Sequence, residues 1–513
     1  MRQYRPDGYR GKEDSRLIGL SKELLKLLRE TQKSFSYDSL RLRKSEIQQL
    51  AEVLVEFAED VHSQIGIWAA YERYNREFFG AGVPFAPTDE ADAGISFERI
   101  RHLLWVLYPE LTPGLIVSPR HQDLLRMAEA AHAFLNAAFR AVPKGSGIKS
   151  FLQTPNQHGW QIKRKLIWLG TCSYMFRLPF RNYLDENNRS RWEIGHVDDF
   201  LCQECTRWSG LGAIDILAGV LDISAEDQRE LRGWHERHAS FYRVEAIADD
   251  RIDTINVISN RAYQIRIDMP KHPFQPGQLI FGSVVPWRGE WYWSGEQEAW
   301  TNTAGIDVEG VRDTMRRENS AILCRFWKEY REQVEARAED LRTTALAYHG
   351  GKDLVTYPNG LAMAADWQKE MRAAWESRSP EQIRQVAEKH GLKEGRPDMS
   401  IPPEVLEHKE GIGVFLHPVE GKEIMCGFQP LIEGLKRGGA DLTEEQEEAI
   451  QQFIDLDAIS PDFVRRVLAA YGAESVKAAF RLPGDAPEYW LEYLLRSRKG
   501  HFYRKRYPAV AVV

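Results

Sequence analysis

Four residues near the middle of the chain have the chemistry of zinc ligands. Cys202 and Cys205 have the C-x-x-C spacing, and His235 and His238 follow downstream, three positions apart. Thiolates and imidazoles together can close a tetrahedral zinc site. The cysteines, however, lie in a stretch that reads as an amphipathic helix and lacks the glycine or proline of a zinc knuckle. We therefore expect two half-buried core cysteines and no cofactor, with a zinc site made by these four residues as the alternative.

A second group of residues has the chemistry of a nucleic-acid or partner-binding surface. The C-terminal stretch LLRSRKGHFYRKRYP interleaves positive charge with aromatic rings, and positive side chains neutralise phosphates while rings stack on bases. The alternatives are a solvated face, or a tail that folds onto the protein and pairs with carboxylates such as those of TEEQEEA, residues 443–449. The candidate binding residues are Arg496, Arg498, Lys499, Tyr503, Arg504, Lys505 and Arg506.

A third candidate is the tryptophan-rich stretch FGSVVPWRGEWYWSGEQ. Trp291 and Trp293 are two positions apart, so they share one face of a strand, while Tyr292 points to the other face. We expect Trp291 or Trp293 to be buried against a helix outside the strands. Trp287 lies in a predicted hairpin turn, where side chains are usually exposed, so we include it among the candidate binding residues. The alternative is an aromatic platform for a peptide or a base.

The sequence contains no catalytic signature. It lacks the spacing of a phosphate-binding loop, the G-x-G-x-x-G of dinucleotide-binding folds and the G-x-S-x-G of a nucleophile elbow. No pair of carboxylates stands in a setting that the sequence shows to be apolar. No catalytic residue can be named, and the sequence favours a protein that is not an enzyme.

These candidate residues are carried by helices on either side of a short β-rich segment. Apolar residues recur every three or four positions from Leu17 to about Arg237, and the period changes to two at Phe241. The predicted domains are residues 1–240 (helical), 241–297 (five short strands), 298–351 (a connecting helix from about Asp307 to Tyr348) and 352–513 (mostly helical, with the basic stretch).

The five strands are too short to form a sandwich with two good faces. We expect them to close into a small SH3-like barrel, which removes most exposed sheet edges. The fold class is therefore mainly α with one small β-barrel, in which helical lobes flank the barrel. Alternation of inward and outward side chains predicts that the barrel core comprises Tyr242, Val244, Ile255, Val257, Ile265, Ile267, Ile280 and Val284.

The composition is that of a multidomain globular protein without a membrane segment. The chain has 513 residues, 43% of them hydrophobic, and a net charge of -7, which argues against a nucleic-acid coat protein but allows a local basic patch. Five cysteines are too few, and odd in number, for a disulfide framework. The N-terminus lacks the apolar stretch of a secretory signal, and no apolar run approaches the roughly 18 residues of a membrane-spanning helix. We expect a cytoplasmic protein.

Three segments carry a resemblance to known sequences: AEVLVEFAEDVHSQIGIWAAYERYNREFFG, EIGHVDDFLCQECTRWSGLGAIDIL and GSVVPWRGEWYWSGEQ. Together they resemble uncharacterised bacterial proteins that are defined only as domains of unknown function. The resemblance implies a bacterial origin and brings no catalytic residues with it.

The architecture favours a non-enzymatic, cytoplasmic adaptor that contacts another protein or nucleic acid through the barrel or the C-terminal basic stretch. Such a protein would suit a nucleic-acid-processing or defence system. The alternative is a metal-dependent enzyme whose Cys/His site lies at the junction of the helical lobe and the barrel.

Overall fold

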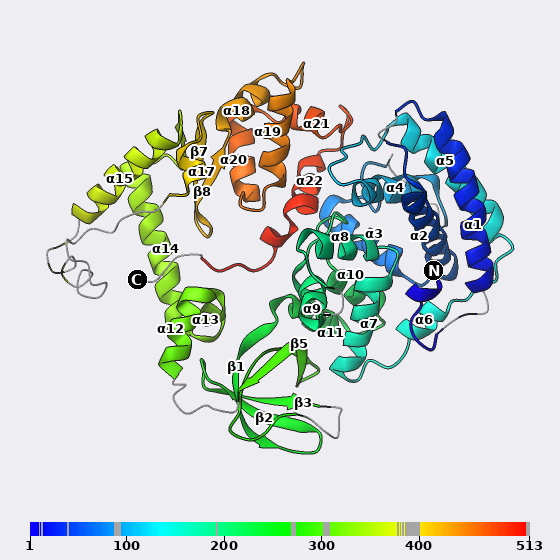
Figure 1. The fold of residues 1–513 in the computed structure, drawn as a ribbon, viewed down its shortest axis with the longest axis horizontal. Helices are drawn as coiled ribbons and strands as arrows, with labels where there is room; N and C mark the ends of the chain where they lie inside the picture. Colours follow the sequence, from blue (N-terminus) through cyan, green and yellow to red (C-terminus); the bar gives the residue numbers. More distant parts are fainter. Residues whose placement is uncertain are drawn as a thin grey trace. The chain divides into compact units, whose positions relative to one another are not determined.

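The chain divides into two compact units, which are coloured by sequence in Figure 1. Unit 1 comprises Met1–Ala304 and Arg481–Arg504, and unit 2 comprises Gly305–Phe480 and Lys505–Val513. The computed structural model describes residues 1–9, 11, 14–37, 40–86, 94–190, 193–267, 273–300, 308–376, 379, 381, 384 and 401–508.

Unit 1 holds a helical lobe with one continuous apolar core and a β-sheet of five strands. The helices of the lobe are α1 (Asp14–Thr31), α2 (Lys44–Ser63), α3 (Ile67–Phe79), α4 (Phe97–Leu111), α5 (Gln122–Phe139), α6 (Gly147–Leu152), α7 (Gly159–Cys172), α8 (Arg177–Glu186), α9 (Ile194–Gln203), α10 (Ala213–Val220), α11 (Ala225–Arg232) and α22 (Trp490–Lys499), with short 3-10 turns at Arg2–Tyr4, Gln32–Ser34, Gly233–Glu236 and Gly500–Tyr503.

The predicted apolar stripe of α2 is confirmed, but the helix ends earlier than its pattern indicates. Leu50, Leu54 and Phe57 are fully buried, as their spacing requires. Gln64 and Gly66 then adopt positive φ angles of 54° and 109°, which an α-helix cannot accommodate, and α3 begins directly afterwards. The sharp turn brings the C-terminus of α2 and the N-terminus of α3 together.

Five strands follow the helices of the lobe, as the change of period predicts. They are β1 (His238–Ile247), β2 (Arg251–Asn256), β3 (Arg261–Arg266), β4 (Leu279–Trp287) and β5 (Glu290–Trp300), and they close in the order β1-β2-β3-β5-β4. The sheet is mixed, because β3 and β5 run parallel while the other neighbours run antiparallel. We call this closed sheet the barrel.

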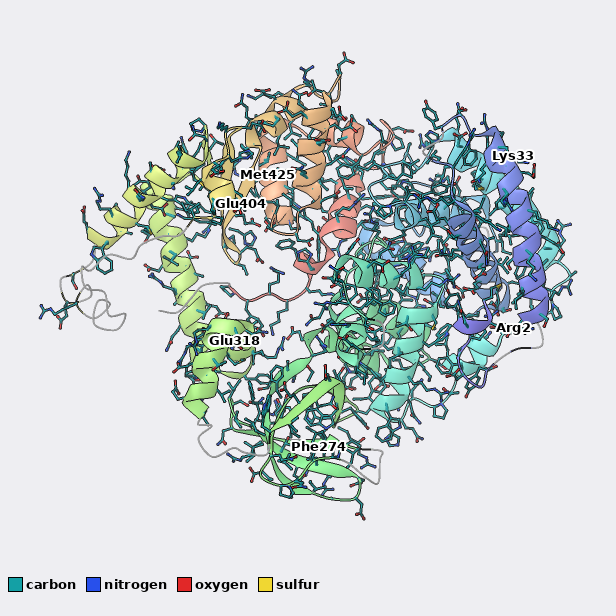
Figure 2. All side chains as sticks on the ribbon, viewed as in Figure 1. Arg2, Lys33, Phe274, Glu318, Glu404 and Met425 are labelled. Atoms are coloured by element: carbon teal, nitrogen blue, oxygen red, sulfur yellow. The ribbon has the colours of Figure 1, made fainter. Side chains whose placement is uncertain are left out.

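The predicted barrel core is correct on β1, β3 and β4 and shifted on β2. Tyr242, Val244, Ile265, Ile280 and Val284 are buried, and Ile267 packs against their cluster from its edge. Phe274, which Figure 2 labels, packs against the same cluster.

On β2 the predicted core residues Ile255 and Val257 are only half-buried, and their neighbours are buried instead. Both faces of β2 carry isoleucine, so alternation alone does not fix its register. Hydrogen bonds fix it: Thr254 Oγ1 donates to the Tyr263 carbonyl (3.2 Å), and Asn256 Oδ1 accepts the Ile258 amide (3.0 Å). These bonds satisfy the Thr254 hydroxyl and the Asn256 side-chain oxygen on the buried face.

Unit 2 begins with three helices where the sequence predicts a single one. They are α12 (Val308–Glu318), α13 (Ser320–Phe326) and α14 (Lys328–Tyr348). The prediction of one unbroken helix from Asp307 to Tyr348 is therefore wrong. The chain leaves helical geometry at Asn319 and Trp327, and the Trp327 ring packs under the guanidinium of Arg312, 4.1 Å from its centroid.

The rest of unit 2 packs helices around a small three-stranded sheet of order β6-β7-β8. The predicted helix starts are confirmed at Thr443, which forms a capping box with Gln446, and at Ser460, whose hydroxyl accepts the Phe463 amide. The elements are β6 (Leu354–Tyr357), α15 (Gly360–Glu376), α17 (Pro403–Leu406), β7 (Ile412–His417), β8 (Gly421–Cys426), α18 (Phe428–Lys436), α19 (Glu444–Asp455), α20 (Pro461–Tyr471) and α21 (Glu474–Ala479).

Candidate binding surface at the barrel rim

Trp287 joins the barrel to the helical lobe of unit 1. Its side chain is 0% exposed, and its indole N–H donates to the Asn156 carbonyl at 2.9 Å. Trp234 packs edge-on against it with ring centroids 6.2 Å apart. The expectation that Trp287 is exposed in a turn is wrong, because the turn itself lies against the lobe: the neighbouring Arg288 pairs with Asp227 at 2.7 Å.

On β5 the side chain that faces the helical lobe is Tyr292 and not Trp291 or Trp293, the reverse of the prediction. Tyr292 is buried against the lobe, next to Trp160 and so close to Gly159 that any side chain there would overlap its ring. Trp291 and Trp293 are half-buried and lie beside Tyr263 and Tyr242 respectively, and Trp293 packs against the barrel core. Buried aromatic side chains do join the barrel to the lobe, but they are Trp287 and Tyr292 and not Trp291 or Trp293.

Four side chains form an aromatic and cationic cluster at the rim of the barrel, which we call the rim cluster. Trp291 lies 4.8 Å from Tyr263 and 5.0 Å from His238 between ring centroids. The Arg261 guanidinium lies 5.3 Å from the Tyr263 centroid and 5.9 Å from that of Trp291. Arg261 is exposed and has no acidic partner among the residues that the structure describes.

The strand pairing explains how these residues meet. Arg261 begins β3, and Trp291, near the start of β5, pairs in parallel register with Ile265. Tyr263 and Ile265 point to the same face of β3, so the parallel pairing carries Trp291 across to Tyr263. His238 begins β1 at the same end. Sequence reasoning missed Arg261 and Tyr263 because nothing in the local sequence predicts a parallel pair between β3 and β5.

A buried ionic network lies at the junction between lobe and barrel. Asp198 of α9 accepts hydrogen bonds from Lys163 of α7, from Arg237 (2.8 Å) and from Ser294 of β5 (3.0 Å). Burial lowers the pKa of Lys163, and Arg237 lowers it further. Gly295 is required here, because its φ is 72° and an added Cβ would lie 2.7 Å from Asp198 Oδ2. Three donors compensate the buried carboxylate of Asp198, so this network holds α7, α9 and β5 together.

The predicted zinc ligands lie near this junction but engage other groups. His235 bonds through Nδ1 to the Cys202 carbonyl (2.9 Å) and through Nε2 to Asp215 (3.0 Å), so both ring nitrogens are occupied. Cys202 is buried, and burial raises the pKa of the half-buried Cys205 thiol to about 12. His238 lies in the rim cluster. Across the described part of the chain, no group of three or more His, Cys, Asp or Glu side chains could hold a metal ion.

The C-terminal basic residues of unit 1 contact their own unit. Arg496 is sandwiched between the rings of Phe78 (4.1 Å) and Tyr503 (4.2 Å). Lys499 is 0% exposed. Arg504 donates to the Cys202 and Glu204 carbonyls at 3.2 and 3.0 Å, so it caps the C-terminus of α9.

The last three candidates extend this pattern of internal contacts. Arg498 is half-buried at the end of α22. In unit 2, Arg506 pairs with Glu420, with Nη2 to Oε2 at 2.8 Å, and Lys505 is exposed with its Nζ 5.2 Å from the Tyr507 ring. The arginines among these residues contact backbone carbonyls, aromatic rings, Glu492 and Glu420.

Comparison with known proteins agrees with the predicted resemblance. A family whose description is "Protein of unknown function (DUF3843)" matches residues 5–205, which cover α1 to α9 and the start of the following loop. The resemblance to proteins defined only by a domain of unknown function is thus confirmed. The match ends before the barrel and does not reach unit 2. No curated protein and no solved structure matches the chain.

None of the described helices is both long and apolar enough to cross a bilayer.

Proposed function

We propose that the protein is a non-enzymatic interaction protein that binds single-stranded nucleic acid at the barrel rim. The observation that carries the proposal is the rim cluster, in which exposed Arg261 lies over the half-buried ring of Trp291 and the buried ring of Tyr263 behind it. Stacking on aromatic rings and pairing of cations with phosphates are the two interactions that sequence-independent single-strand binders combine. A third ring, that of His238, lies beside the same tryptophan.

The barrel's strand order supports this proposal over the predicted SH3-like type. An SH3-like barrel is an antiparallel meander, whereas here β3 pairs in parallel with β5 and β4 returns to β1. We propose that the barrel is of the five-stranded Greek-key type found in oligonucleotide- and oligosaccharide-binding folds. This is an analogy of fold, so the argument for function rests on the rim residues themselves.

We place the nucleic-acid contact at the rim and not in the C-terminal basic stretch. Arg504 caps a helix and Arg506 pairs with Glu420, so phosphates would have to displace these contacts. Arg261 has no such acidic partner among the described residues. A phosphate can therefore pair with it without first displacing a carboxylate. We also propose a cytoplasmic location, since all five cysteines are free thiols and disulfides form in oxidising compartments.

The proposal is tested by fluorescence anisotropy with an end-labelled oligothymidine of about 20 nucleotides, longer than the roughly 4–16 nucleotides covered by one such barrel. Trp291→Ala should weaken binding by about 1–3 kcal/mol, the usual contribution of one stacked base. Arg261→Ala should also reduce the slope of log K against log salt by about 0.7, the value for one phosphate of a single strand.

The matched control is Arg251→Ala, an exposed arginine of the same barrel that pairs with Asp253 at 3.6 Å. It should leave affinity within about twofold, because a paired surface arginine contributes little. Absence of oligothymidine binding at low salt would refute the proposal, as would equal losses in Trp291→Ala and Arg251→Ala. Binding that survives both rim substitutions but is lost on Arg504→Ala would move the site to the C-terminal stretch.

A further inference from the structure

A cavity of about 680 Å³ lies in the helical lobe, away from the barrel, and no part of the proposed function uses it. It is framed by the C-terminus of α2, the N-termini of α3 and α4, and the C-terminus of α5. Its size falls within the roughly 300–1,000 Å³ of small-molecule sites. All of its lining residues fall within the segment that the family match covers.

The inner wall of the cavity is apolar and rigid. Trp68, Phe139 and Ile95 line it and are almost wholly buried, so they are held by the core behind them. Trp68 is fixed further, because its indole N–H donates to Glu72 at 2.9 Å. Ala69 lines the cavity on the exposed side of α3 and leaves room there. Such a wall suits a flat apolar ligand.

Both acidic side chains that line the cavity are already compensated. Asp60 accepts the amides of Gly66, Ile67 and Trp68, and also the Tyr174 hydroxyl at 2.7 Å. Burial raises the pKa of Asp60, and these donors work against that rise.

Glu72 is compensated by cations as well as by the indole of Trp68. Arg99 donates two hydrogen bonds to the Glu72 carboxylate, at 2.7 and 2.9 Å, and Arg76 donates a third at 3.4 Å. The remaining guanidinium nitrogen of Arg99 donates to the Gly94 carbonyl at 2.5 Å. Neither acid is left to attract a cation, and all three guanidinium nitrogens of Arg99 already donate to Glu72 or Gly94.

Two cations at the mouth of the cavity are uncompensated. Arg140, directly after α5, and Lys144 are both exposed, and neither pairs with any residue that the structure describes. His62 also faces the cavity, and its Nε2 lies 2.9 Å from the Val142 carbonyl. The titratable groups of the site are therefore two neutralised acids, one engaged arginine, one histidine and two unpaired cations.

We infer that this cavity binds a small organic anion, with its flat apolar part against Trp68 and its carboxylate or phosphate at Arg140 and Lys144. The excess positive charge at the mouth selects an anion, because its attraction for a charged group is not offset by nearby acids. The apolar wall selects an organic molecule over an inorganic ion.

Isothermal titration at low salt with 2-naphthoate as the probe, and with neutral 2-naphthamide for comparison, tests this inference on the full chain. The carboxylate should bind at least tenfold more tightly than the amide. The double charge reversal Arg140→Glu with Lys144→Glu should weaken naphthoate binding by roughly tenfold or more, from loss of attraction and added repulsion. Ala69→Trp should block the cavity and abolish binding of both probes.

The matched control is the double reversal Lys22→Glu with Lys26→Glu, two exposed lysines of α1 that do not line the cavity. It changes the net charge of the protein equally, so it should leave naphthoate affinity within about twofold if the effect is local. Failure of naphthoate to bind, equal affinity of the amide, or an equal loss in the control would each overturn the inference. Oligothymidine binding should be unchanged in the Ala69→Trp variant, so the two proposals fail separately.

Discussion

Replacement of Trp287 by alanine should destabilise unit 1 more than any other single change in the tryptophan-rich stretch. The indole is 0% exposed and belongs to the core cluster of the helical lobe although it lies on a barrel strand. Truncation therefore removes packing from both parts of unit 1 at the point where they meet.

The magnitude follows from two contributions. Truncating a buried tryptophan to alanine typically costs about 3–5 kcal/mol. The lost indole N–H also leaves the Asn156 carbonyl without this 2.9 Å donor, which adds about 1 kcal/mol. We expect the free energy of unfolding to fall by roughly 4–6 kcal/mol, a large fraction of the 5–15 kcal/mol of a typical domain.

The assay is urea denaturation followed by far-ultraviolet circular dichroism, since the substitution would alter a tryptophan fluorescence signal. The transition of unit 1 should move and that of unit 2 should not. Trp291→Ala is the control, because this half-buried indole on the adjacent strand should cost distinctly less. If Trp291→Ala destabilised as much as Trp287→Ala, or if Trp287→Ala cost under about 1.5 kcal/mol, the claim that Trp287 joins the barrel to the lobe as a buried contact would be refuted.

Three further predictions concern the surroundings of the junction. Arg504→Ala should cost about 1 kcal/mol and speed amide hydrogen exchange at the end of α9, because the helix loses its cap; unchanged exchange there would contradict this. Although burial opposes the shift, His235 and Arg504 lower the pKa of Asp215. Its stabilisation is therefore complete above the unfolded value of about 3.9 and is lost as pH falls through the lower folded pKa. Asp215→Asn should flatten the acid side of the stability profile, and an unaltered profile would count against the pair. Finally, burial raises the pKa of Cys205 to about 12, so this thiol should alkylate far more slowly than a free cysteine at pH 8, until the protein is unfolded; rapid labelling of the native protein would argue otherwise.

Much of the architecture could be predicted because the patterns repeat over many residues. The stripe of α2, the five strands and the caps at Thr443 and Ser460 all follow from local periodicity or local hydrogen bonding. The apolar stripe after the barrel is compatible with one unbroken helix, so it could not predict that the helix is interrupted. Its breaks depend on Trp327 packing against Arg312, a contact between residues fifteen positions apart that no local pattern specifies.

The candidate site was harder to predict, because its residues come together through long-range pairing. Trp287 is buried only because the hairpin turn meets Trp234 and Asn156 of the lobe. Arg261 and Trp291 approach each other only through the parallel pairing of β3 with β5. His238 and Trp291 could be named as candidates from their chemistry, but Arg261 and Tyr263 could not.

The most direct test of the central claim is photocrosslinking of an oligothymidine carrying 5-iodouracil, followed by mass spectrometric mapping of the crosslinked peptides. We predict crosslinks to Trp291, with few elsewhere, because the iodouracil base must lie against the ring that it modifies. Crosslinks confined to residues 496–506, or a pattern unaltered by Trp291→Ala, would contradict binding at the barrel rim.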